Sequence, residues 1–379
     1  MGYQQVKKPK FYVDMLSYLH ATGNGKYLQN SSDVNLASGE YEDVLYGNPV
    51  SIVSRNIINS SGGSMMYMSS PEWEANKTAE NCFPTFYTDF VAILNHNFGG
   101  LEVYVGSKSE DNLTEASFGS ASGAGVFNAD KSVNINKSED DYQTYNGFSL
   151  GVLETPFKFE NRGRIFMYNS PDTNNANMGS RYFGSFMMGN TWTPPHNPNL
   201  SMNITRKFDG IKSKRTQSGH TRADMDYIGR PLWAGHNAFE LWNYDYNHKV
   251  TPPTVETMIQ EDPKANLGNM GRRSWKLTWD SINETDVFNS IEGSNLNNLF
   301  NDGGQNLIGV DNPFLEQKSF ISRVWTPTLG GTLPFMFQID DSNMNPDQFV
   351  LARFKKNSLT TRNKAPHLYS FSVEIEEVY

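Results

Sequence analysis

The chain has 379 residues, which is room for two or three domains of ordinary size. Aromatic residues make up 13% and charged residues only 19%, which excludes a disordered chain, because disordered chains are poor in aromatics and rich in charge. The net charge is −9, with 13 Lys and Arg against 20 acidic residues in positions 1–195 and 19 against 21 in the rest, so neither half has the positive balance of a nucleic-acid binder.

The first 195 residues show strand patterns joined by turn-forming Asn and Gly. Residues 11–21 fit a helix ended by Gly23 or a strand, because periodicity does not decide at this length. Residues 90–94 form a continuous apolar run, as in a strand buried on both faces, whereas residues 101–105 alternate. Further strand-like blocks lie at 148–153, 164–168 and 182–188.

A proline-rich break at residues 191–198 separates this region from the rest, because prolines remove ladder donors and restrict the residues before them. Three strands are expected after it, and the last alternates most clearly; they are at 200–208, 273–279 and 369–376. Two short helices are expected near 285–300 and 314–324. The expected fold class is mainly β, with two domains of β-sandwich or barrel type. The expected division is an N-terminal arm at 1–37 and domains at 38–195 and 196–379.

Motifs that carry chemistry are scarce in this sequence. There is no glycine-rich phosphate loop with its Lys-Ser/Thr, no His-Glu-x-x-His and no serine nucleophile elbow. The single cysteine, Cys82, allows no internal disulfide and no cysteine-based zinc site. We therefore predict no catalytic residue and no cofactor. Residues 1–10 are polar, so we expect no secretory leader, and no apolar run approaches the roughly 18 residues of a membrane-spanning helix.

Two acidic clusters are candidate metal or acid–base sites. Asp340 and Asp341 can bind Ca²⁺ through their oxygens, or they belong to a polar turn between strands. Asp224 and Asp226, near His220, can form a metal or acid–base cluster, or they lie in a solvated loop. Both alternatives stay open for each cluster.

A candidate ligand-binding edge follows the apolar run at 90–94. Asn95, His96 and Asn97 carry amide and imidazole groups, which hydrogen-bond sugar hydroxyls in both directions. The alternative is that these side chains tie the end of the strand to a neighbouring loop.

A basic segment stands out in this acidic chain. Residues 206–230 contain seven Lys or Arg against three Asp. This imbalance favours either a charged contact between subunits, made through Lys212, Lys214 and Arg215, or an ordinary solvated hairpin.

One resemblance covers residues 38–198. The run 90–98 is followed by the strand 101–105 and much later by residues 182–189 and the Trp-Thr-Pro at 192–194. This order resembles the discoidin-like, or galactose-binding-like, β-sandwich modules of bacteriophage virion proteins. The Pro-Glu-Trp at 71–73 fits a surface loop of such a module.

A second resemblance covers residues 200–379. The strand at 273–279, a helical stretch, Gly330-Gly331 and the segments 334–337, 346–354 and 369–378 follow one another in that order. This order resembles the β-domain of distal tail and minor tail proteins of long-tailed bacteriophages, of the lambda minor tail protein M type. Insertions at 246–271 and 293–312 depart from that compact pattern.

Both resemblances imply a structural component of a bacteriophage virion. The implied role is a ring at the distal end of the tail that links the tail tube to the tail hub or to a host-recognition fibre. The ring would be a homo-oligomer, hexameric by resemblance. Two rival readings remain: a carbohydrate-binding adhesin that recognises a host-surface glycan, and an enzyme that degrades surface polysaccharide.

Overall fold

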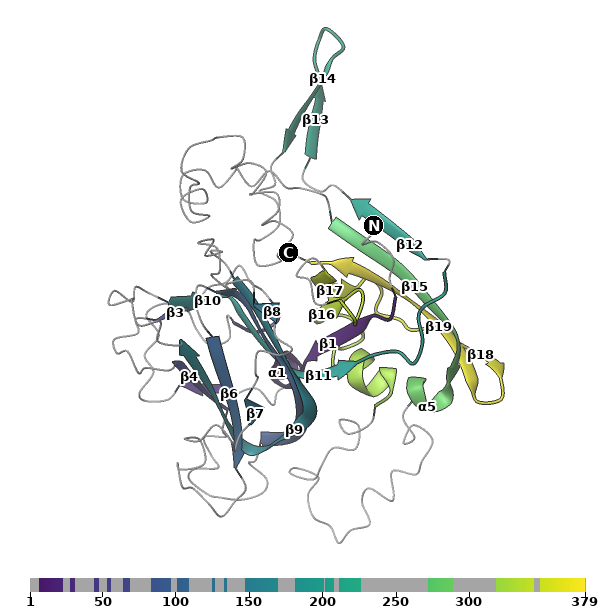
Figure 1. Cartoon of the computed structure of the whole chain (residues 1–379). Coiled ribbons are helices and arrows are strands. Elements are labelled where there is room, and N and C mark those ends of the chain that lie inside the picture. The colour runs from purple at the N-terminus through teal and green to yellow at the C-terminus, as the bar shows by residue number, and fades with distance from the viewer. Residues whose placement is uncertain are drawn as a thin grey trace.

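The computed structural model is mainly β, as the sequence predicts (Figure 1). Its description covers residues 7–22, 28–30, 44–47, 53–55, 64–68, 83–96, 101–108, 125–126, 133–134, 147–169, 181–200, 202–207, 211–225, 272–288, 318–343 and 348–378. Within these ranges, fifteen strands form one large antiparallel sheet, two strand pairs stand apart from it, and the helices are few and short.

The elements before residue 196 comprise one short helix and eleven of the described strands. The helix is α1 (Met15–Ala21). The strands are β1 (Lys10–Asp14), β2 (Leu28–Asn30), β3 (Val53–Arg55), β4 (Ser64–Met68), β5 (Phe83–His96), β6 (Leu101–Lys108), β7 (Gly125–Val126), β8 (Val133–Asn134), β9 (Gly147–Asn169), β10 (Arg181–Phe183) and β11 (Ser185–Trp192).

The later elements comprise a short helix, one turn of π-helix and eight described strands. The helical segments are α5 (Glu284–Val287) and η6 (Ile321–Trp325). The strands are β12 (Asn203–Lys207), β13 (Ile211–Arg215), β14 (Thr221–Met225), β15 (Arg272–Asn283), β16 (Phe335–Gln338), β17 (Phe349–Phe354), β18 (Thr361–Ala365) and β19 (Leu368–Glu377).

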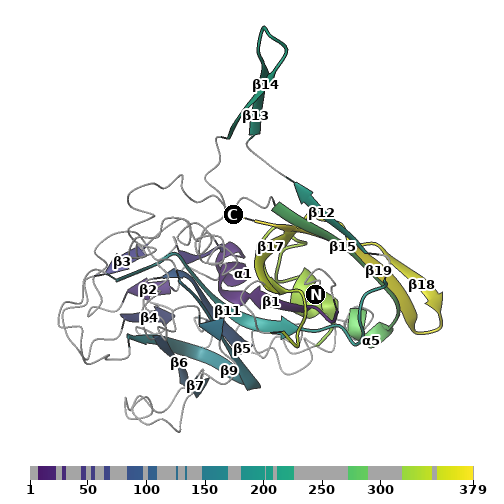
Figure 2. The same cartoon turned by 45° about the horizontal axis from the view of Figure 1, so that its top comes forward.

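The large sheet runs through strands from both ends of the chain. Its main path is β12-β15-β19-β17-β16-β1-β11-β5-β9-β4-β2, and every pairing on it is antiparallel. β1 pairs with β11 on one edge and with β16 on the other, so Phe11 lies between Trp192 and Phe337. Figure 2 shows β5 and β9 on one side of β1, and β15, β18 and β19 on the other. The segment 11–21, which periodicity left open, holds both a strand and a helix.

Alternate residues of the central strands face two separate cores. On β1, Phe11 and Val13 pack into one core, while Tyr12 packs into the other with Phe90 and Met187. β16 and β17 alternate in the same way, because successive side chains of a strand point to opposite faces. This is why the burial of β1, β16 and β17 is almost continuous rather than periodic.

The core on the C-terminal side is rich in aromatic rings. Phe371 stacks on Trp279 with centroids 5.2 Å apart, and Phe320 lies 4.8 Å from Phe371. Phe11 reaches into the same core, 5.2 Å from Phe337. Aromatic side chains bury large areas, so this cluster is the main apolar contribution of the region to stability.

Several expected elements differ in extent from the structure, among them the first expected helix and two strand-like blocks. The helix expected over 285–300 is interrupted after α5, because Phe288 has an extended backbone. The ring centroid of Phe288 lies 4.9 Å from that of Tyr369. Residues 289–300 lie outside the described part. The blocks 148–153 and 164–168 belong to one strand, β9. Its register with β5 shifts between Val152 and Phe157, a stretch that contains Pro156, and prolines inside sheets favour such irregularities.

Asp14 fixes the junction between β1 and α1. It is the N-cap of α1, and its side chain is 2% exposed. Its carboxylate accepts hydrogen bonds from the backbone N–H groups of Leu16 (3.1 Å), Ser17 (3.2 Å) and Met188 (3.1 Å), and from the Ser17 hydroxyl. Burial raises the pKa of Asp14 from 3.8 to about 6, although these hydrogen bonds act to lower it.

The free energy of unfolding should therefore rise as the pH falls from about 7 to about 4.5 through the contribution of Asp14. An acid whose pKa is raised in the folded state disfavours folding above its folded pKa, and this cost disappears below its unfolded pKa. A shift of about two units corresponds to roughly 3 kcal/mol over the whole titration range, and about 2 kcal/mol of it falls between pH 7 and pH 4.5. Urea unfolding of the wild type and of Asp14→Asn at both pH values measures it. The Asp14→Asn variant should show a smaller difference between the two, and an equal difference in both proteins would contradict the assignment.

Candidate functional site

The β13–β14 hairpin projects from the rest of the described chain (Figures 1 and 2). Its two strands pair only with each other within the described ranges. Its turn is closed by the N–H of Thr216, which donates to the carbonyl of His220 (2.7 Å), and Gly219 adopts a φ of +85° there. Residues 212–223 are all exposed, so this part of the hairpin has no packed core of its own.

Positive charge gathers on this hairpin. Lys212, Lys214 and Arg215 lie on β13, and Arg222 lies on β14 directly opposite Lys214. Like charges at opposite positions destabilise a strand pair, and an isolated two-stranded hairpin is marginally stable in water. The basic segment of the sequence is therefore an exposed hairpin.

The structure describes only part of two other candidate sites, the cluster near His220 and the edge at 95–97. His220 occupies the exposed turn just before β14, and Asp224 stands opposite Lys212 in the ladder. Asp226 lies outside the described residues. Asn95 and His96 are the last residues of β5, with His96 opposite Gly147, and Asn97 also lies outside the described part.

Asp340 and Asp341 lie in a polar turn after β16. The carboxylate of Asp340 accepts from the N–H (3.1 Å) and hydroxyl (2.6 Å) of Ser342 and forms an ion pair with Lys7 at 3.1 Å. Burial alone would raise the pKa of Asp340, but the Ser342 hydrogen bonds and Lys7 hold it below its ordinary value. The N–H of Asp341 donates to the carbonyl of Lys8 (2.9 Å). Among the described residues, no group of three His, Cys, Asp or Glu gathers as metal ligands do.

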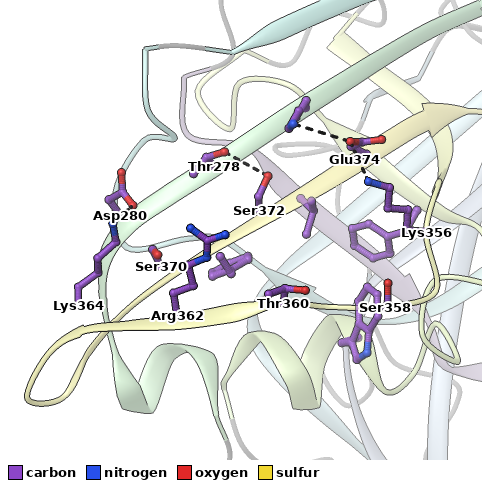
Figure 3. A pocket seen from close by; sticks show the side chains of 15 residues that line it. Thr278, Asp280, Lys356, Ser358, Thr360, Arg362, Lys364, Ser370, Ser372 and Glu374 are labelled. Atoms are coloured by element: carbon purple, nitrogen blue, oxygen red, sulfur yellow. Dashed lines mark hydrogen bonds and ion pairs between the residues drawn. The ribbon is translucent and has the colours of Figure 1, made fainter.

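A polar groove of about 490 Å³ lies over β15, β18 and β19 (Figure 3). The strand alternation that sends Trp275, Leu277 and Trp279 into the core places Lys276 and Thr278 on the opposite, outer face. Two cross-strand pairs, Lys276 with Glu374 and Thr278 with Ser372, lie side by side on this face, and Arg362 on β18 stands opposite Ser370. The segment 354–360 and Trp325 form the remaining wall.

The groove carries more cations than carboxylates. Glu374 is shared by Lys356 (3.3 Å) and Lys276 (4.0 Å), and Asp280 pairs with Lys364 at 3.9 Å. Arg362 forms no ion pair with any described residue, and Figure 3 shows its side chain reaching over Ser370 into the groove. Hydroxyl groups fill the space between the charges, from Thr278, Ser358, Thr360, Ser370 and Ser372.

Two adjacent glycines, Gly330 and Gly331, allow Trp325, which forms one wall of the groove, to pack closely against Phe354. Gly331 has a φ of +92°, and a β-carbon there would lie 2.6 Å from Cβ of Phe354. Gly330, with a φ of +64°, lies beside the Trp325 ring and the carbonyl of Asn357. The Gly-Gly turn therefore places η6 against the end of β17, where the ring centroids of Trp325 and Phe354 are 5.3 Å apart.

Sequence reasoning missed this groove. The outward residues of β15 and β19 were visible as the polar half of two alternating strands. No local signal indicated that β15 and β19 are neighbours, because their paired residues lie about 90 positions apart in the chain. β18 pairs with β19 through a short local turn, so it belongs to the groove only because β19 lies beside β15.

None of the described helices is long and apolar enough to cross a membrane. No family model, no curated protein and no solved structure matches the chain.

Proposed function

We propose that the chain is a non-catalytic structural subunit of a bacteriophage virion, in a ring at the distal end of the tail. In this proposal residues 38–195 form a discoidin-like sandwich and residues 196–379 form a tail-tube-like β-domain. The ring would contact the tail tube on one side and the hub or a fibre on the other. The order of motifs along the sequence supports the family, and the exposed basic hairpin supports the assembly role.

The hairpin is the observation that carries the proposal. An exposed strand pair that carries four basic side chains gains from a partner whose acidic surface covers it. The chain as a whole has a net charge of −9, so another copy offers acidic surface for such a contact. A projecting arm that engages the next copy, repeated around an axis, closes into a ring.

Reversing two hairpin charges, Lys214→Glu with Arg215→Glu, should weaken self-association about 100-fold, because charge reversal at a complementary interface costs about 2–5 kcal/mol. Glu at position 214 would face Arg222, so the hairpin itself should be stabilised rather than unfolded. Light scattering after size-exclusion chromatography, with electron microscopy of the largest species, measures assembly.

The matched control is Lys318→Glu with Lys355→Glu, two exposed lysines outside the hairpin. It should assemble as the wild type does, and the wild-type association should weaken as salt is raised. Normal ring formation by the hairpin variant, or equal loss in the control, would contradict the proposed contact.

A further inference from the structure

We propose that the groove over β15, β18 and β19 is a binding site for a carboxylated sugar residue, such as a hexuronic or sialic acid unit of a glycan. This inference goes beyond the assembly role and does not depend on it. It also differs from the sequence-based candidate edge at 95–97, which lies on β5 and just after it.

The charge balance of the groove selects a carboxylated ligand. Four cationic side chains line it against two carboxylates, in a protein that is acidic as a whole. Each carboxylate already has a lysine partner, whereas Arg362 has no carboxylate partner among the described residues. A guanidinium binds a carboxylate through two parallel N–H donors, so an incoming anionic group completes the pairing.

The hydroxyl groups of the groove favour a ligand that carries hydroxyl groups as well as a negative charge. Ser370 stands opposite Arg362, and Thr360 and then Ser358 follow along the groove away from it. Each hydroxyl can donate one hydrogen bond and accept others, which matches the hydroxyl groups of a sugar ring. A small inorganic anion would leave this set of donors and acceptors unused.

Trp325 supplies an apolar surface at one end of the groove. Its indole is partly exposed and is held against Phe354 by the Gly330-Gly331 turn. The negative face of an aromatic ring attracts the weakly positive C–H groups of a sugar. A volume of about 490 Å³ lies within the range of small-ligand pockets, roughly 300–1,000 Å³. Cationic, hydroxyl-bearing and aromatic walls therefore converge on one space of suitable size.

Ligand-observed NMR and calorimetry on the full chain test this proposal with four probes: sodium glucuronate, N-acetylneuraminate, glucose and acetate. At least one of the two acidic sugars should bind with a dissociation constant in the millimolar range. Glucose lacks the carboxylate and acetate lacks the ring, so each should bind at least about tenfold more weakly. Equal binding of acetate would show a general anion site, and equal binding of glucose would show that the charge is not used. Either result, or no binding of either acidic sugar, would overturn the proposal.

Arg362→Gln should lower the affinity for the acidic sugar by about tenfold or more, because it removes the charged partner while keeping a polar side chain of similar length. Arg362 is exposed, so the thermal unfolding midpoint should be unchanged. The matched control is Lys318→Gln, an exposed cation outside both the groove and the hairpin, which should bind as the wild type does. Unchanged affinity in Arg362→Gln, or an equal loss in Lys318→Gln, would overturn the assignment without bearing on ring assembly.

Discussion

Replacing Trp275 with alanine should lower the free energy of unfolding by about 3–5 kcal/mol, the usual cost of truncating a buried tryptophan. The Trp275 side chain is 2% exposed and lies 5.5 Å from the ring of Phe337. It stands between Ile204 and Ile375 in the ladder, so truncation leaves a cavity that three strands share. Such a loss is a large fraction of the stability of an ordinary domain. Urea unfolding followed by circular dichroism measures it.

Lys276→Ala is the matched control for this substitution. Lys276 is the next residue of β15 but faces outward. Its ammonium nitrogen lies 4.0 Å from a carboxylate oxygen of Glu374, and more than half of the lysine side chain is exposed. Its loss should change the free energy of unfolding by no more than about 1 kcal/mol. Similar losses in the two variants would show that Trp275 is not a core residue.

Gly189→Ala should be the most damaging small substitution in the sheet. A β-carbon at position 189 would lie 2.2 Å from the carbonyl oxygen of Val13 and 2.8 Å from the backbone nitrogen of Met15. Both are backbone atoms, so relief requires β1 to move away from β11. We expect a loss of about 3 kcal/mol or more, at the upper end for overpacking. Differential scanning calorimetry of the full chain measures the effect.

Gly219→Ala is the glycine control. Gly219 lies at the hairpin turn, where a β-carbon meets nothing within 4 Å, and only its φ of +85° disfavours alanine. The cost should be about 1 kcal/mol and confined to the hairpin, leaving the main transition in place. An unaltered main transition in Gly189→Ala would show that β1 and β11 do not pack as closely as described.

The strands with a regular alternation could be predicted from the sequence alone. Residues 273–279 and 369–376 repeat every second position, and this local pattern requires one buried and one outward face whatever their partners are. The basic segment was also visible, since Lys212, Lys214 and Arg215 lie within four positions of the chain. These features depend on neighbours in sequence, which is why composition and periodicity reveal them.

The role of β1 and the existence of the groove required the tertiary structure. Residues 11–21 have no decisive period, and Asp14, where the strand gives way to the helix, also accepts a hydrogen bond from Met188 far along the chain. Tyr12 donates to Gln338 (2.6 Å) across 326 positions, a pairing that no local pattern encodes. Arg362 likewise lines the same groove as Thr278 and Ser372 only because β19 lies between β15 and β18. The sequence of a strand determines which of its side chains share a face. Which strand lies beside it depends on the burial that the whole sheet achieves. The site could therefore be located only from the folded chain.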